Sequence, residues 1–372
     1  IPVDSDTLFE LNDLAEDVGK VYKAISAKTT NPVLECIKLK AGDGVLVLSA
    51  TDQELYIEKV VNADVKIEGE TLVPGRFFAD FVRKLTREQI ELSLNDGRLF
   101  IRYHGNEGAL SCRDAEEFPV MPDLGNAQYF VIAQNDFRDL IAKIVFSVSL
   151  DDARPMLKGV NLEVGEDSLV GVALDGYRLA KCVKPLRKTT AMMSAVVPSR
   201  SISEISKLLE DVDDDVTVYI QKRYVMVDLI HTKIYASLLD GDFMNYKHII
   251  PTNFNTVVTL PKEQFEDSLE RAVLLARSDR NNLVKIVKFD IGGDMLEISA
   301  GSEIGNVNER IVARIDGTDL SIGFNAKYFI EMLKFVTCDN IVIKFTNAVT
   351  PCVVVPTGDS EEFMYLILPV RM

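Results

Sequence analysis

The chain repeats one series of markers three times, and this repetition limits its fold more than any other feature. Phe9, Phe137 and Phe265 stand at equal intervals (137 − 9 = 128 and 265 − 137 = 128), and each opens an amphipathic stretch with helical spacing. A turn then follows at Gly42, Gly165 and Gly292, and ten residues later come Asp52, Asp175 and Ser302. A period of about 125 residues is the length of a domain, since solenoid units recur every ~20–50 residues. The sequence therefore predicts three tandem domains, with boundaries at 1–126, 127–252 and 253–372.

Each repeat predicts the same α+β content. Apolar residues recur every three or four positions after each of the three phenylalanines, and again at Phe77–Leu85, Ile202–Leu209 and Phe329–Val336, so each repeat has two helices. Alternating segments between the helices predict roughly eight short strands per repeat. Asn95-Asp-Gly lies between two of them and predicts a tight hairpin. Antiparallel sheets with helices on one face are the expected architecture.

Composition favours a reduced intracellular compartment. The five cysteines are scattered and odd in number and form no Cys-x-x-Cys pair, as in a protein without disulfides. The acidic start, IPVDSDTLFELND, lacks the basic region of a signal peptide, and no apolar run is long enough to cross a membrane. The net charge of −16 argues against nucleic acid, although a local basic stripe can exist on an acidic body.

The sequence offers no catalytic or metal-binding constellation. The three histidines share no ligand spacing, and the acidic cluster at 211–215 lacks the glycine and glutamate of a calcium loop. An enzyme with a site at a domain junction stays open as an alternative, supported only by Asp52 and Asp175 at equivalent positions. The third repeat has Ser302 there, which a turn that supports the fold tolerates better than a catalytic residue would. We therefore expect no enzyme activity, no cofactor and no metal.

Several segments in order resemble the bacterial DNA polymerase sliding clamps, the beta subunits of the replicative polymerase. They are KTTNPVL (28–34), TDQEL (51–55), VPGRFF (73–78), EFP (117–119), DGYRLA (175–180), VPSR (197–200), IGFN (322–325) and LPVRM (368–372). No single segment is specific, but their order and spacing extend over nearly the whole chain. The resemblance implies three copies of one clamp domain, closed head to tail with a second chain into a ring. Helices line the hole of that ring and antiparallel sheets form its outside.

The resemblance also implies a function. Such a ring encircles duplex DNA without reading its sequence and tethers the replicative polymerase, which gives processivity. Other implied partners are the clamp loader, repair polymerases and ligase, all docking by short peptide motifs, in the cytoplasm at the nucleoid. The alternative is a triplicated peptide-binding scaffold that does not encircle DNA.

By position, the resemblance assigns a peptide-binding pocket between the second and third repeats. Its residues are Leu157, Leu174, Gly176, Tyr177, Arg178, Leu179, Met244, His248, Ile249, Asn325, Tyr328, Val349, Pro351, Leu366, Ile367, Leu368, Pro369, Val370, Arg371 and Met372. An apolar groove with a few polar groups suits an extended peptide with Leu or Phe anchors. Five positions depart from the family pattern: Leu174, Tyr177, Met244, His248 and Pro351. The pocket is still expected, but its preferred peptide is left open.

The resemblance assigns DNA-facing and dimer-forming residues as well. Lys28, Arg76, Arg83 and Arg200 match basic positions that face DNA, and Asp17 and Asp80 make the same helices mixed in charge. A weak, sequence-blind attraction is what movement along a duplex requires. The alternative for each cation is an ordinary solvated helix face. Leu110 on one side, and Leu274 and Leu275 on the other, are the expected contacts between chains at exposed sheet edges.

Overall fold

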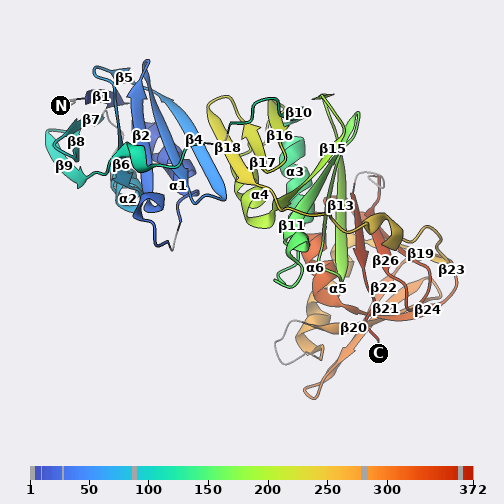
Figure 1. Cartoon of the computed structure of the whole chain (residues 1–372). Helices are drawn as coiled ribbons and strands as arrows, with labels where there is room; N and C mark the ends of the chain where they lie inside the picture. The colour runs from blue at the N-terminus through green and yellow to red at the C-terminus, as the bar shows by residue number, and fades with distance from the viewer. Residues whose placement is uncertain are drawn as a thin grey trace. The chain divides into compact units, whose positions relative to one another are not determined.

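The computed structural model describes residues 5–9, 11–26, 29–85, 90–121, 123–277, 284–358 and 363–371, with side chains described from Leu14 onward. The chain forms two compact units (Figure 1). The first unit comprises Ile1–Gln134 and Ser203–Leu238, and the second comprises Asn135–Ile202 and Leu239–Met372. The middle repeat thus contributes residues to both units.

The same order of elements recurs in each repeat. The first contains β1 (Ser5–Phe9), α1 (Leu11–Tyr22), η1 (Pro32–Glu35), β2 (Cys36–Gly42), β3 (Val45–Thr51), β4 (Leu55–Asn62), β5 (Asp64–Val65), β6 (Gly69–Pro74), α2 (Gly75–Lys84), β7 (Ile90–Asn95), β8 (Arg98–Tyr103), β9 (Asn106–Ser111) and η2 (Ala115–Glu117). The second contains β10 (Gln128–Ala133), α3 (Gln134–Val145), η3 (Pro155–Lys158), β11 (Gly159–Val164), β12 (Ser168–Leu174), β13 (Arg178–Pro185), β14 (Lys188–Thr189), β15 (Met193–Pro198), α4 (Ser199–Ser206), β16 (Asp215–Ile220), β17 (Tyr224–Asp228), β18 (Thr232–Ser237) and η4 (Tyr246–Ile249). The third contains β19 (Thr256–Pro261), α5 (Lys262–Leu275), β20 (Ile286–Gly292), β21 (Met295–Gly301), β22 (Asn306–Val312), β23 (Arg314–Gly317), β24 (Leu320–Asn325), α6 (Ala326–Leu333), β25 (Asn340–Phe345), β26 (Cys352–Pro356) and β27 (Phe363–Ile367). Within the described residues each repeat has nine strands, slightly more than the eight expected.

The sheets of neighbouring repeats are continuous. In the first unit, β18 pairs with β4, so the strands run in the order β10-β16-β17-β18-β4-β3-β2-β6. In the second unit, β13 pairs with β27 and gives the order β15-β11-β12-β13-β27-β26-β25-β19-β23. Each unit also has one smaller sheet, β5-β1-β7-β8-β9 in the first and β22-β21-β20-β24 in the second. Strands β9 and β22 each lie at the edge of their sheet.

The tight hairpins form where the sequence places them. Asn95 pairs with Arg98 across Asp96 and Gly97, both of which have positive φ (48° and 71°). Gly42 pairs with Val45 across Asp43 and Gly44, again with both φ positive. Two positive φ values define the turn whose twist matches antiparallel strands. The predicted hairpin is confirmed, and Gly42-Asp-Gly44 is likewise a strand turn.

Two expectations about the helices were wrong in detail. Phe9 does not open a helix but ends strand β1, which pairs with β7, and helix α1 follows at Leu11. On α2, Phe78 and Val82 are fully buried whereas Phe77 is 68% exposed. The apolar stripe of α2 therefore faces its sheet without Phe77, which lies about 100° around the helix from Phe78.

Each junction between repeats has its own apolar cluster. At the β4–β18 junction, the rings of Phe118 and Tyr235 both meet Tyr56 edge-on, with centroids 6.1 and 5.9 Å away. All three rings are buried in the first unit together with Leu72 and Met226. Burial raises the pKa of Tyr56 to about 12, so its hydroxyl stays protonated. The first junction is thus closed by aromatic side chains.

Candidate functional site

The pairing of β13 with β27 brings together the leucines of the predicted pocket. Leu179 lies opposite Leu366, and both are fully buried. Leu157 from η3 and Leu174 from the end of β12 join them in one apolar cluster, and the partly buried Leu368 packs against its side. The five leucines that the sequence assigned to one pocket therefore belong to one apolar cluster or pack against it, together with Val172, Val353, Val355 and Tyr246.

Backbone hydrogen bonds fix the segment after β27. The amide of Leu368 donates to the carbonyl of Tyr177 at 2.8 Å, and that of Val370 donates to the carbonyl of Gly323 at 2.8 Å. Pro369 lies between these two bonds and has no amide hydrogen to offer. Arg371 is exposed, and Met372 lies outside the described residues.

A capped turn presents Tyr177 to solvent. The Asp175 carboxylate accepts hydrogen bonds from the amides of Tyr177 (2.8 Å) and Arg178 (3.0 Å), while Gly176 has φ +95°. A left-handed residue at this position turns the chain sharply, and the Tyr177 side chain is left 63% exposed. The guanidinium of Arg154 lies beside Gly176, with one nitrogen 2.7 Å from where a Cβ would stand.

The same turn occurs at the equivalent positions of the other repeats. Asp52 accepts from the amides of Glu54 (3.0 Å) and Leu55 (2.8 Å). In the third repeat the Ser302 hydroxyl accepts from the amide of Ile304 at 3.4 Å. A serine can replace the aspartate because both side chains cap a turn through oxygen. These observations favour the turn over the catalytic interpretation of Asp52 and Asp175.

Arg178 ties the middle repeat to the third. Its side chain is only 10% exposed and forms ion pairs with Asp175 (Nε to Oδ2, 3.0 Å) and with Glu331 of α6. It also donates to the carbonyl of Phe146 at 2.8 Å and lies 4.7 Å from the ring centroid of Tyr328. Burial alone lowers the pKa of Arg178, but Tyr365, Glu331 and Asp175 outweigh it and raise that pKa, so the guanidinium is permanently charged.

The other predicted residues differ in their surroundings. Asn325 is buried and caps α6, its side chain accepting from the amides of Lys285 (3.0 Å) and Lys327 (3.3 Å). It therefore supports the helix that carries Tyr328. Ile367 is fully buried in β27, where it pairs with Arg178. Seven other side chains reach solvent at least in part: Met244, His248, Ile249 and Val349 are exposed, and Tyr328, Pro351 and Val370 are half-buried.

Three residues near this site were missed from the sequence. Tyr246 is buried in the leucine cluster, and its hydroxyl donates to Glu163 at 3.2 Å. Burial, with Glu163 nearby, raises its pKa, so that hydroxyl stays protonated. Glu331 and Arg154 are the others. Tyr246 stands two residues before His248, which was a usable signal, but nothing in the sequence pairs Glu331 with Arg178.

The described basic residues that were assigned to DNA lie on two helices, α2 and α4. Arg76 and Arg83 of α2 are exposed and share Asp80 as an ion-pair partner, at 4.0 and 3.0 Å. Arg200 is exposed near the start of α4. Lys28 lies outside the described residues. Asp17 is buried on α1, where its carboxylate lies 3.5 Å from Lys59.

Of the residues assigned to the dimer, Leu110 lies on the edge strand β9, whereas Leu274 and Leu275 lie on helix α5, which contacts the edge strand β22. Leu110 is half-buried on β9. Leu274 is 77% exposed in the last turn of α5, and the adjacent Leu275 is half-buried. Helix α5 is held to β22 by Arg271 and Glu309, 2.7 Å apart. Leu274 also lines a pocket of about 900 Å³ beside the β21–β22 turn.

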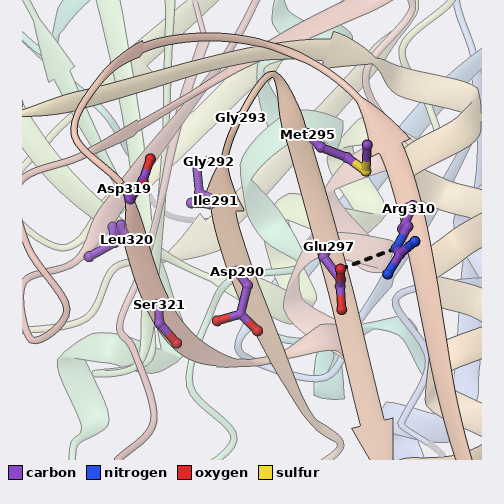
Figure 2. A pocket seen from close by; sticks show the side chains of 10 residues that line it. All are labelled: Asp290, Ile291, Gly292, Gly293, Met295, Glu297, Arg310, Asp319, Leu320 and Ser321. Carbon is purple, nitrogen blue, oxygen red and sulfur yellow. Dashed lines mark hydrogen bonds and ion pairs between the residues drawn. The ribbon is translucent and has the colours of Figure 1, made fainter.

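A second pocket, of about 520 Å³, opens on the sheet β22-β21-β20-β24 (Figure 2). Three of its four charged lining residues form ion pairs: Glu297 pairs with Arg310 at 3.2 Å, and Asp290 pairs with Lys288 at 2.8 Å. Asp319 crowds Gly292, where a Cβ would stand 2.7 Å from the carboxylate. Acidic side chains that are already paired with cations do not offer a set of free ligands for a metal ion. No group of residues able to hold a metal occurs in the described ranges.

No helix in the described parts of the chain is long and apolar enough to cross a membrane.

Comparison with known proteins assigns the family. Models of the DNA polymerase III beta subunit match residues 8–122 (N-terminal domain), 131–245 (central domain) and 247–371 (C-terminal domain). The beta sliding clamp of Staphylococcus aureus strain Mu50 is 30% identical over 365 residues, which are 95% of this chain and 96% of the relative.

Solved structures agree with this assignment. The DNA polymerase sliding clamp from Bacillus subtilis is 31% identical with a TM-score of 0.94, covering 100% of both chains. A sliding clamp from Pseudomonas aeruginosa, solved bound to griselimycin, is 23% identical with a TM-score of 0.94, covers 99% of this chain and 100% of its own, and supports the fold alone. Three successive clamp domains, each with helices and antiparallel sheets, thus make up this chain, and it belongs to the family of bacterial DNA polymerase III beta subunits, the beta sliding clamps.

Proposed function

We propose that this chain closes with a second copy into a ring around duplex DNA and tethers the replicative polymerase by a peptide docked on the surface beside the β13–β27 junction. Members of its family are non-catalytic processivity clamps of DNA polymerase, so DNA and the polymerase are the partners that membership implies. The scaffold and enzyme alternatives are not favoured by that membership. The mechanism is topological, since a closed ring cannot leave a duplex sideways.

The docking surface is the leucine cluster together with the apolar side chains that remain exposed beside it. The buried members supply a floor, and Tyr177, Met244, Ile249 and Val349 are exposed large apolar side chains on the loops that follow. Burying one leucine or phenylalanine of a peptide contributes about 1.5–3 kcal/mol before ordering costs. Two such anchors give a reversible contact, which suits a surface shared by several partners.

The role of Arg178 in this proposal is to hold the surface rather than to meet the peptide. Its side chain is nearly buried and its donors are engaged by Asp175, Glu331 and Phe146. It thereby fixes the Tyr177 turn against the Tyr328 ring. Arg154 and Arg371 are exposed, so their charges are accessible to an incoming peptide, and the exposed His248 side chain can form a hydrogen bond with it.

A single docking surface per chain fits the difference between the two junctions. The equivalent place at the β4–β18 junction contains the buried rings of Tyr56, Phe118 and Tyr235. The β13–β27 junction has leucines at its strand pairing instead. Smaller, flexible side chains leave more room for a guest than three interlocked rings.

For DNA we propose contacts by Arg76, Arg83 and Arg200, with Lys28 as a further candidate. Arg76 and Arg83 are exposed, yet both lie near Asp80, which lowers their combined attraction for phosphate. A weak electrostatic contact allows sliding, because tight base contacts would stop it. Ring closure would pair the free edge of β9 with that of β22 in the second copy, with Leu110 meeting Leu274 and Leu275.

We also propose the boundaries 1–126, 127–252 and 253–372 for the three domains, and action at the nucleoid. The clamp loader, repair polymerases and ligase are proposed to dock on the same peptide surface, one at a time.

Peptide binding tests the docking surface. A polymerase tail peptide containing Leu and Phe would be titrated into the wild type and into a variant lacking residues 368–372. The deletion removes Leu368 and the bonds to Tyr177 and Gly323, so affinity should fall at least about tenfold, equivalent to ~1.4 kcal/mol. Met192→Ala, an exposed apolar change elsewhere in the second unit, is the control. Equal affinity of the deletion variant and the wild type contradicts the assignment.

Retention on DNA tests the ring. Protein loaded by the clamp loader of the same cell should elute with nicked circular DNA and dissociate once the circle is linearised. Retention that is indifferent to linearisation would indicate ordinary surface binding instead.

A further inference from the structure

Helix α2 exposes an aromatic side chain beside a free strand edge. Phe77 is 68% exposed in the first turn of α2. One turn later, Phe81 lies over β9: a Cβ at Gly108 would stand 2.8 Å from its Cζ. The Phe81 ring also meets Tyr103 edge-on, with centroids 5.8 Å apart. Side chains four residues apart share one face of a helix, so Phe77 lies on the same face of α2 as Phe81, the face next to the edge strand β9.

The other sheet edge also has an unusual apolar side chain. Ile304 is 87% exposed in the turn between β21 and β22, where polar residues are the rule. It lines the pocket of about 900 Å³ together with Leu274, Ala276 and Gly301. Val312, at the far end of β22, is exposed as well. This surface, which we call the β22 edge, has an exposed apolar side chain at each end of an outermost strand whose exposed positions in between, Asn308 and Arg310, are polar.

The two edges match in length, and each has an exposed apolar side chain beside its strand, Phe77 at one and Ile304 at the other. Strands β9 and β22 have six and seven residues, and each is the outermost strand of its sheet. The pocket at the β22 edge is lined by Arg277 and Lys285 with a single acid, Glu303. The first edge has two exposed acids, Glu107 on β9 and Asp80 on α2, and both are already paired with arginines, Arg102 and Arg83. A head-to-tail contact between two copies joins different surfaces and needs only this kind of mutual fit.

We infer that Phe77 of one chain enters the pocket at the β22 edge of a second copy and packs against the partner's Ile304 and Leu274. The contact between chains then includes helix α2 as well as strand β9. This inference rests on the proposed ring and adds an aromatic anchor, Phe77, that comes from a helix. The neighbouring Phe81 ring covers β9 at Gly108, a position that has no side chain to block it.

A charge exchange tests the contact. Phe77→Lys and Ile304→Glu should each raise the dissociation constant of the dimer about tenfold for each contact, and so about a hundredfold for a ring with two contacts. The variant with both changes should recover much of that loss, because the new cation then faces the new anion. Sedimentation velocity over a range of concentrations measures all four proteins. Ile230→Lys, a 78% exposed isoleucine in the β17–β18 turn, is the control and should dissociate as the wild type does.

The outcomes separate this inference from the proposed ring. Both substituted side chains are exposed in the single chain, so circular dichroism and thermal unfolding should stay unchanged and exclude misfolding as the cause. A wild type that is monomeric at every concentration contradicts the ring itself. A dimeric wild type with unaltered single variants overturns the Phe77 contact and leaves the ring standing. Weakened single variants without recovery in the doubly changed protein overturn the facing of Phe77 and Ile304.

Discussion

Replacing Arg178 by glutamine should destabilise the second unit without emptying its core. Glutamine keeps most of the aliphatic volume but loses the charge that Asp175, Glu331 and the Tyr328 ring share. Removing one partner of a buried ion pair costs about 3–5 kcal/mol, because the other charge is left buried. The Glu331 side chain is 42% exposed and can be rehydrated, so we expect the lower end, about 3 kcal/mol.

Urea unfolding followed by circular dichroism measures this loss in the free energy of unfolding. Arg154→Gln is the matched control, since Arg154 is exposed beside the same turn at Gly176. A surface change of that kind should stay within about 0.5 kcal/mol. Peptide affinity should fall for Arg178→Gln, as the Tyr177 turn loses its anchor. A loss of less than about 1 kcal/mol, or a loss equal to that of the control, would refute the view that Arg178 holds the two repeats together.

Three further predictions concern DNA, backbone and pH. Asp80→Asn frees Arg76 and Arg83 from their shared carboxylate, so affinity for duplex DNA in a fluorescence anisotropy titration should rise severalfold at low salt and show a steeper salt dependence; an unchanged titration would argue that α2 does not face DNA. Gly317→Ala should lower the free energy of unfolding by more than about 2 kcal/mol, because φ is +121° and a Cβ would stand 1.9 Å from the Asn255 carbonyl oxygen. Gly44→Ala, where φ is also positive but no atom of the described residues lies near the added Cβ, should lower it less. Equal losses in urea unfolding would contradict the role of that clash. Burial, the largest influence, raises the pKa of Asp17 above 3.8 despite Lys59 and Lys20, so the ionised carboxylate destabilises the fold above that raised pKa, whereas well below 3.8 the carboxyl is neutral in both the folded and the unfolded chain. Asp17→Asn should therefore raise the thermal midpoint at pH 7 but not at pH 3. A midpoint that falls at pH 7 would mean that the ion pairs outweigh burial.

The repeated architecture was readable from the sequence because its markers are local. Hairpin turns such as Asp96-Gly97 require particular residue types, and the buried stripe at Phe329, Met332 and Leu333 follows helical spacing. Phe9 misled because its spacing from Phe137 is that of the repeat, while its own backbone belongs to a strand. Periodicity reports which side chains are buried, not which element begins at a given residue.

The contacts made by the site residues were harder to predict from the sequence than the identity of those residues. The position-by-position resemblance named Leu179 and Leu366, which the β13–β27 register places opposite each other. It also named Arg178 and Asn325 as pocket residues, although one is engaged in ion pairs and the other caps a helix. Which side chains face solvent depends on partners more than a hundred residues away, such as Glu331 for Arg178. Such partners leave no trace in local spacing.

Strand β27 completes a sheet begun by the middle repeat, and this has a consequence during synthesis. Leu179 is translated long before Phe363–Ile367 exists to lie beside it. A ribosome that stalls or terminates early therefore releases a product whose β13 has a bare edge and no seat for a client peptide. If the polymerase docks at this junction as proposed, only chains finished through that last strand recruit it, and interrupted translation products cannot compete for it.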